Sequence, residues 1–127
     1  MSKKSAIPQP LSEGEESLAR DLKAYKIPFD REWKFHPERN FAIDFKLQCR
    51  QSGYALAGVE VEGGTLFGKS RHSRGEGFER DCEKYNEAAR LGIKIFRFTT
   101  AQIKSANAID YIRDFYNSLT GEDGVKI

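Results

Sequence analysis

Residues 41–47 read FAIDFKL and residues 58–64 read GVEVEGG, and these two stretches decide the fold. In the first, large apolar residues alternate with small or charged ones that include Asp44, which is typical of a strand with one buried face. In the second, Glu60 and Glu62 occupy one strand face and valines occupy the other. If a turn joins the two strands into a hairpin, Asp44 can lie on the same face as both glutamates.

The rest of the chain predicts further elements around this hairpin. Ser12 and Glu15 resemble a capping box, which predicts a helix to about Lys26. A strand is expected over residues 31–35, before the hairpin, and another over residues 93–98. Two more helices are expected over about residues 76–91, ending at a glycine, and about residues 106–119. The predicted order is therefore α-β-β-β-α-β-α.

Apolar residues at helical spacing predict which face of each helix is buried. The expected inward residues are Leu18, Leu22 and Tyr25 in the first helix, Phe78, Cys82, Tyr85 and Ala89 in the second, and Ile109, Ile112, Phe115 and Tyr116 in the third. We expect one domain over residues 13–120, with tails at 1–12 and 121–127.

Composition narrows the class of protein. No stretch is long and apolar enough for a membrane span, and the N-terminus has no apolar run typical of a signal peptide, so a cytoplasmic protein of a bacterial or phage-infected cell is expected. Cys49 and Cys82 match no zinc-ligand spacing, which favours buried free thiols. The net charge of +2 neither requires nor excludes a nucleic-acid partner.

The carboxylates in the two strands indicate chemistry. Acidic side chains rarely lie in apolar strands unless a partner neutralises them. A divalent cation is a common partner, and Mg²⁺ prefers oxygen ligands. Asp44, Glu60 and Glu62 are therefore predicted metal ligands, in a site that would hydrolyse phosphodiester bonds.

Other residues are candidates for the same site, each with a plainer alternative. Glu15 continues the buried stripe of the first helix, although a capping-box glutamate would look the same. Lys84 lies one turn from Asp81 and could face phosphate, or the two could form an ordinary surface pair. The glycine-flanked basic loop is either a set of DNA phosphate contacts or a solvated surface, and its candidates are Lys69, Arg71, His72 and Arg74.

The chain contains an ordered set of motifs: Glu15-x-x-Leu18, Phe41-x-x-Asp44-Phe45, residues 59–63 (VEVEG), Asp81-x-x-Lys84 and Gly92-x-x-x-Phe96-Arg97-Phe98. Taken together, these motifs resemble the PD-(D/E)XK nuclease superfamily. The resemblance is greatest to its small very-short-patch-repair-like and phage-type endonucleases and to Holliday-junction resolvases with an Arg-His-x-Arg-Gly loop. It implies an α/β (α+β) fold with a restriction-endonuclease-like αβββαβ core, in which helices flank a central mixed sheet.

The resemblance also implies an activity, which is DNA cleavage with Mg²⁺ or Mn²⁺. Asp44 and Glu60 would be the two metal ligands, and Glu15 would complete the site. Glu62 departs from the superfamily, because lysine usually occupies this position. Lys84 could supply the missing lysine from the following helix, Lys46 is a less favoured substitute, and Glu62 could be a further metal ligand.

Three functions remain open on the sequence. The first is a metal-dependent endonuclease for branched, mismatched or nicked DNA, in which cutting a four-way junction symmetrically would require a homodimer and a single nick only a monomer. The second is a catalytically inactive nucleic-acid-binding module of the same fold, which the missing lysine favours. The third is a domain whose acidic strand binds a basic protein.

Overall fold

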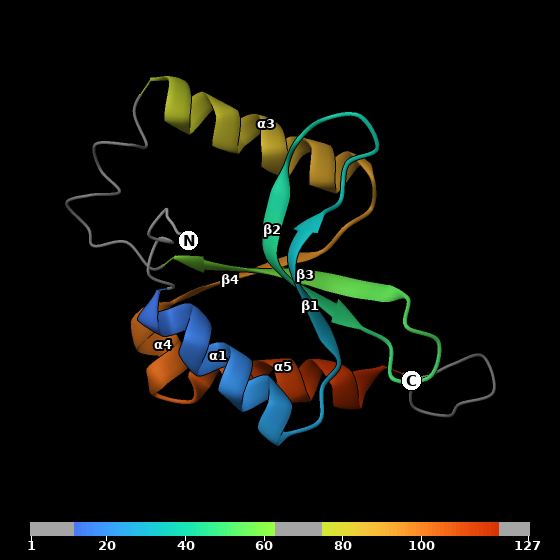
Figure 1. The fold of residues 1–127 in the computed structure, drawn as a ribbon, viewed down its shortest axis with the longest axis vertical. Helices are drawn as coiled ribbons and strands as arrows, with labels where there is room; N and C mark the ends of the chain where they lie inside the picture. The colour runs from blue at the N-terminus through green and yellow to red at the C-terminus, as the bar shows by residue number, and fades with distance from the viewer. Residues whose placement is uncertain (1–11, 63–74, 120–127) are drawn as a thin grey trace, which may run out of the picture.

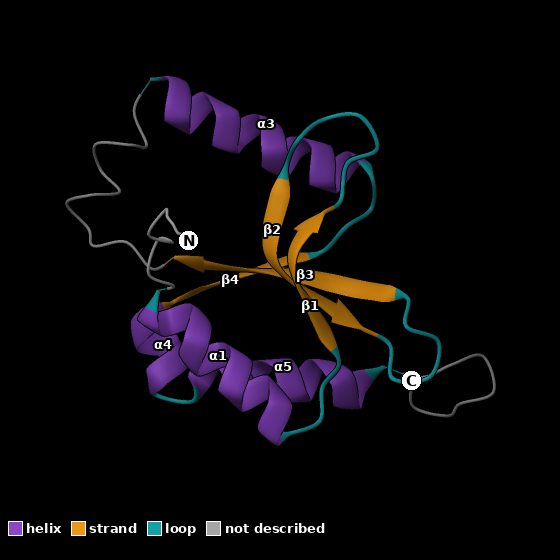
Figure 2. Ribbon diagram, viewed as in Figure 1, coloured by secondary structure: helices purple, strands orange, loops and turns teal. Residues whose placement is uncertain are grey.

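The computed structural model of this protein describes residues 12–62 and 75–119, which form helices and strands joined by short loops (Figure 2). The elements, in chain order, are α1 (Glu13–Ala24), β1 (Phe29–Lys34), β2 (Ala42–Gln48), β3 (Ala55–Glu62), α3 (Glu76–Arg90), β4 (Ile95–Thr99), α4 (Thr100–Lys104) and α5 (Asn107–Ser118). Every expected helix and strand is present within a few residues of its predicted bounds, and α4 is the addition.

The four strands form one mixed sheet in the order β1-β2-β3-β4. Neighbours β1 and β2, and β2 and β3, are antiparallel, whereas β3 and β4 are parallel. Figure 1 shows α1, α4 and α5 together on one side of the sheet and α3 alone on the other. The predicted α+β class, with helices flanking a mixed sheet, is confirmed.

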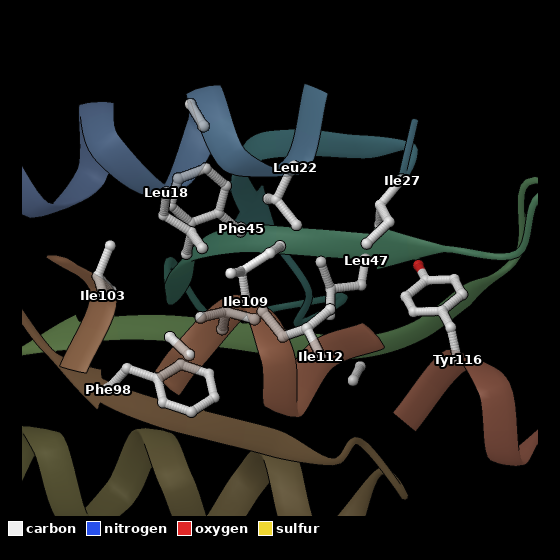
Figure 3. Packing of buried hydrophobic residues seen from close by; sticks show 14 residues of the cluster. Leu18, Leu22, Ile27, Phe45, Leu47, Phe98, Ile103, Ile109, Ile112 and Tyr116 are labelled. Carbon is white, nitrogen blue, oxygen red and sulfur yellow. The ribbon is translucent and has the colours of Figure 1, made fainter. Parts of the chain in front are cut away.

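The apolar core lies between the sheet and the layer of α1, α4 and α5 (Figure 3). Leu18 and Leu22 of α1 are fully buried there, as their spacing predicted. Serine at position 12 begins α1, because its side chain accepts a hydrogen bond from the Glu15 N–H at 3.0 Å. Ala19 and Ile27 lie in the same core, and residues of the strands and of the C-terminal helices complete it: Phe45, Leu47, Ala57, Val59, Phe98, Ile103, Ala108, Ile109, Ile112 and Tyr116.

Helix α3 is attached to the other side of the sheet mainly by polar contacts. His36, whose side chain is 4 % exposed, donates from Nε2 to Glu87 at 2.7 Å while its Nδ1 accepts two backbone N–H groups. Arg39 pairs with Glu83 at 2.8 Å, and Arg80 donates to the Asn40 carbonyl at 3.1 Å. Ala88 is the one residue of α3 that is fully buried.

The predicted buried face of α3 is largely wrong, and that of α1 is wrong at its last residue. In α3, Phe78, Cys82 and Ala89 are exposed, because the helix meets the sheet through charged and polar side chains. In α1, Tyr25 is 44 % exposed, since the helix ends at Ala24 and the Tyr25 ring lies instead under Arg113.

The structure also bears on the expectations for the cysteines and for membrane-spanning segments. Both cysteines are free, but one of them, Cys82, is exposed rather than buried. Over residues 12–62 and 75–119, no helix has the length and apolarity needed to cross a membrane.

Candidate active site

Asp44 and Glu60 meet where the pairing of β2 and β3 ends. The backbone register of this pair stops at Phe45 opposite Val59, one residue before the two carboxylates. Beyond it, Glu60 Oε1 accepts a hydrogen bond from the Asp44 N–H at 2.9 Å. In return, Asp44 Oδ2 accepts one from the Val61 N–H at 2.8 Å. Each carboxylate is thus fixed by the backbone of the opposite strand, and the hairpin brings the two together as predicted.

The neighbouring strand β1 is also irregular at this level. Arg31 pairs with Phe45 and Trp33 with Ile43, so Glu32 lies opposite Asp44. Glu32 has a φ of 54°, in the left-handed region that is unfavourable for a residue with a side chain. Asp44 therefore lies where the pairing of β2 with β3 ends, and opposite an irregular residue of β1, although the pairing of β1 with β2 continues past it.

Glu60 is the buried acid of the site, with 8 % of its surface exposed. Its Oε2 atom lies 2.5 Å from Lys84 Nζ and accepts a hydrogen bond from the Tyr85 hydroxyl at 2.8 Å. Lys84 therefore points inward to the strand carboxylate, and its position favours the site over the surface-pair alternative. A buried carboxylate needs a positive charge or hydrogen-bond donors nearby. Lys84 of α3 supplies this positive charge to Glu60.

Glu15 reaches the edge of this group from the start of α1. The preceding residue, Gly14, is buried, and a side chain there would lie 2.7 Å from Thr100 Oγ1 and 3.0 Å from Val61 Cγ1. The absence of a side chain therefore lets α1 begin against the end of β3. The Glu15 carboxylate contacts Arg31 at 3.5 Å, and its charge also acts on Asp44.

Asp44 is an acid of this group whose ionisation is unfavourable. Burial, and then the negative charge of Glu60, raise the pKa of Asp44 from 3.8 to about 7, with a smaller contribution from Glu15. The Val61 N–H and Lys84 act in the opposite direction without cancelling these effects. Within the described residues, the one hydrogen bond to this carboxylate goes to Oδ2, so Oδ1 is an available ligand.

Glu62 has a different environment from the other two strand acids. Its Oε2 accepts a hydrogen bond from Arg97 Nε at 2.8 Å, and the Arg97 guanidinium lies 4.6 Å from the centre of the Tyr85 ring. Tyr85 in turn donates to Glu60, so Glu62 is linked to Glu60 through two side chains. The pKa of Tyr85 is raised well above its usual value by burial and by the charge of Glu60.

Sequence reasoning missed Tyr85 and Arg97 as members of this group. Tyr85 was expected as part of an apolar stripe, and only its hydroxyl makes it a partner of Glu60. Arg97 carried a signal that could have been used, because it is a charged residue in an otherwise apolar strand. The register of the parallel pair places it directly beside Glu60.

The remaining candidates either contact other residues or lie outside the part of the chain that the structure describes. Lys46 lies 3.6 Å from Asp30 and 5.8 Å from the centre of the Trp33 ring, which argues against its use as the substitute lysine. The predicted DNA contacts, Lys69, Arg71, His72 and Arg74, lie outside the described residues. In the parts of the chain that are described, no three acidic, histidine or cysteine side chains are arranged to hold a metal ion.

Comparison with known proteins adds no identification. The chain matches no protein-family model, and neither the curated proteins nor the solved structures contain a match. The geometry of Asp44, Glu60, Lys84 and their neighbours therefore carries the functional argument by itself.

Proposed function

We propose that this protein is a metal-dependent endonuclease that hydrolyses phosphodiester bonds in branched or otherwise distorted DNA. One observation carries the proposal: Asp44 and Glu60 lie across a break in the sheet, with Lys84 directed at the same point. Such a group supplies oxygen ligands for a hard cation and a positive charge for phosphate. The resemblance to the PD-(D/E)XK superfamily, including its restriction-endonuclease-like core, is consistent with this order of residues.

The donors fit Mg²⁺ or Mn²⁺ in chemistry, although they are not assembled as a finished site. Asp44 offers Oδ1, and the pKa of this carboxyl is raised by burial and by the charge of Glu60, both of which a bound cation would oppose. Glu60 would share or give up its contact with Lys84. A bound cation would lower the pKa of a coordinated water and stabilise negative charge on the phosphoryl group.

The surrounding residues have supporting parts in this proposal. If Asp44 and Glu60 held a cation, Lys84 would be positioned to bind phosphate oxygen or to orient the attacking water. Tyr85, which contacts Arg97, would help to hold the Glu60 carboxylate in position. Glu15 lies close enough to contribute negative charge to the cation, and Arg31 holds its carboxylate.

The test is cleavage of a panel of labelled DNA substrates with Mg²⁺ and with Mn²⁺. The panel contains a four-way junction, a mismatched duplex, a nicked duplex and a matched linear duplex. We expect cleavage of at least one distorted substrate in preference to the linear duplex, and symmetric cuts in the junction would require a homodimer. No cleavage of any substrate with either metal would refute the enzyme proposal.

Substitutions that preserve side-chain size test which residues take part in cleavage. Asp44→Asn and Glu60→Gln keep the size of the side chains and should reduce cleavage at least about 100-fold, a scale seen when a charge-stabilising catalytic group is removed. DNA binding should persist in both. Asp30→Asn is the control, because Asp30 is an exposed acid on β1 that pairs with Lys46 outside the site. Full activity in Lys84→Ala would remove the lysine from the mechanism.

A second function has one observation in its favour. Lys84 already neutralises the buried Glu60 carboxylate, an arrangement that an inactive nucleic-acid-binding module of this fold would retain. Metal titration distinguishes the two functions without DNA. An active site should bind Mn²⁺ in the wild type and lose this affinity in Asp44→Asn, whereas an inactive module should show no such difference.

A further inference from the structure

A second charged site lies at the other end of β2, away from the carboxylates. A hollow of about 180 Å³ is lined by Tyr25, Arg50, Arg113, Tyr116 and Asn117. Arg50 is six positions beyond Asp44, which corresponds to about 20 Å along an extended chain. The end of α1, the chain just after β2 and the last turn of α5 meet at this hollow.

Each arginine of the hollow lies against a tyrosine ring. The Arg50 guanidinium is 4.9 Å from the centre of the Tyr116 ring, and the Arg113 guanidinium is 4.1 Å from that of Tyr25. Tyr116 is a rigid support, because it is 2 % exposed and its hydroxyl donates to the Gln48 carbonyl at 2.7 Å (Figure 3). Stacking orients a guanidinium and leaves its N–H groups available for an anion.

The two arginines are weakly neutralised. Arg50 has no carboxylate within ion-pair distance in the structure as described, and its recorded contact is with the Tyr116 ring. Among the described residues, Arg113 has one ion-pair partner, Asp110, at 3.9 Å, and both side chains of this pair are about half exposed or more. An exposed pair at such a distance stabilises little and exchanges readily for a better ligand.

The geometry points to a phosphate-binding site between Arg50 and Arg113, separate from the carboxylate centre. Two guanidinium groups and the Asn117 amide supply donors on adjoining walls of a hollow that is large enough for a phosphate group. The phosphate belongs either to a nucleic-acid backbone or to a small phosphate ester. Its assignment to DNA held away from the cleaved bond rests on the proposed function, whereas the anion site does not.

The test compares Arg50→Gln and Arg113→Gln with Arg20→Gln, an exposed arginine of α1 whose loss changes the net charge equally. One arm measures binding of labelled duplex DNA in EDTA at several salt concentrations. Each hollow variant should reduce the slope of log affinity against log salt by about 0.9, and affinity about eightfold at 0.1 M salt. The other arm titrates inorganic phosphate and thymidine monophosphate by calorimetry.

The outcomes separate the two phosphate sources. A loss in the DNA arm identifies the nucleic-acid backbone, and a loss confined to the calorimetric arm identifies a small phosphate ester. If both hollow variants match Arg20→Gln in both arms, there is no phosphate site here. The measurement needs neither metal nor cleavage, so its result does not depend on whether the protein is an endonuclease. Urea unfolding of each variant verifies that these surface changes leave the fold intact.

Discussion

Replacing Asp44 by asparagine is expected to stabilise the protein above pH 7. The wild-type carboxyl must ionise next to Glu60 in a partly buried position, which raises its pKa from 3.8 to about 7. The asparagine has nearly the same shape, and its side-chain oxygen can still accept the hydrogen bond from the Val61 N–H. The substitution therefore removes an unfavourable charge and keeps the local contacts.

The size of the effect follows from the two pKa values. A change from 3.8 to about 7 corresponds to about 4 kcal/mol at 1.36 kcal/mol per pH unit. Because the carboxyl is partly exposed, solvent screening reduces our expectation to about 2 kcal/mol. The Asp44 carboxyl binds its proton more tightly in the folded state than in the unfolded state. Its contribution to the free energy of unfolding is therefore fully present below about pH 4 and is lost as the pH rises through about 7.

The assay is urea unfolding of the wild type and Asp44→Asn between about pH 3 and about pH 8.5, a range that spans both pKa values of the Asp44 carboxyl. The variant should gain about 1 M in its urea midpoint at pH 8 and nearly nothing at the acid end. Other titrating groups cancel, since both proteins contain them. A difference that does not vary with pH would refute the electrostatic explanation.

Adding Mg²⁺ at pH 8 extends this test to the proposed metal. A cation held by Asp44 should stabilise the wild type by about 2.7 kcal/mol at 100 times its dissociation constant, and Asp44→Asn much less. Equal stabilisation of both proteins would place the cation elsewhere.

Three further substitutions test particular contacts by the same unfolding assay. Without metal, Lys84→Met should lower the free energy of unfolding by about 3 kcal/mol, because it leaves the buried Glu60 carboxylate without its positive partner. The double variant Lys84→Met with Glu60→Gln should regain most of this stability. No recovery in the double variant would contradict the pairing. Gly14→Ala should cost about 1–3 kcal/mol through contact with Thr100 and Val61, and should also slow cleavage by displacing Glu15. Glu32→Gly should stabilise by up to about 1 kcal/mol by relieving the left-handed backbone, whereas Glu32→Ala, which keeps that backbone unfavourable, should not.

The sheet and the layer of α1 and α5 could be predicted because their residues follow simple periods. Alternation in residues 41–47 and 58–62 identified two strands and the acids between them. Ser12 marked the start of α1, and Gly92, with a φ of 79°, ended the region of α3. In these segments, burial of apolar side chains decides the structure, and the sequence records that burial directly.

Helix α3 shows where this reasoning stops. Many of its contacts are hydrogen bonds and ion pairs, with the loop between β1 and β2 and with Glu60. An apolar stripe was therefore a poor guide to its orientation, and Phe78 is exposed. The helix α4 has five residues and was too short for a periodic signal, although Thr99 and Gln102 form a capping box. The sequence was a weaker guide to where helices, strands and strand pairings end, because these ends depend on residues that are distant in the sequence.

The candidate site likewise contains residues that the sequence could identify and contacts that it could not. Asp44, Glu60 and Lys84 were recognised as residue types in a suitable order, and the structure brings them together. The role of Glu62 could not be predicted, because its partner Arg97 comes from a strand 35 positions later. The exchange of hydrogen bonds between the carboxylates and opposite backbones also depends on the exact end of the β2–β3 pairing.

The polar attachment of α3 makes the two sides of the sheet unequal in cooperativity. The layer of α1, α4 and α5 shares a continuous apolar core, whereas α3 contributes one fully buried residue. Helix α3 should therefore open as a separate unit, with its amides exchanging hydrogen for deuterium sooner than those of α5. Since Lys84 and Tyr85 belong to α3, each such opening would uncover Glu60, and the population of the assembled site would respond to salt concentration.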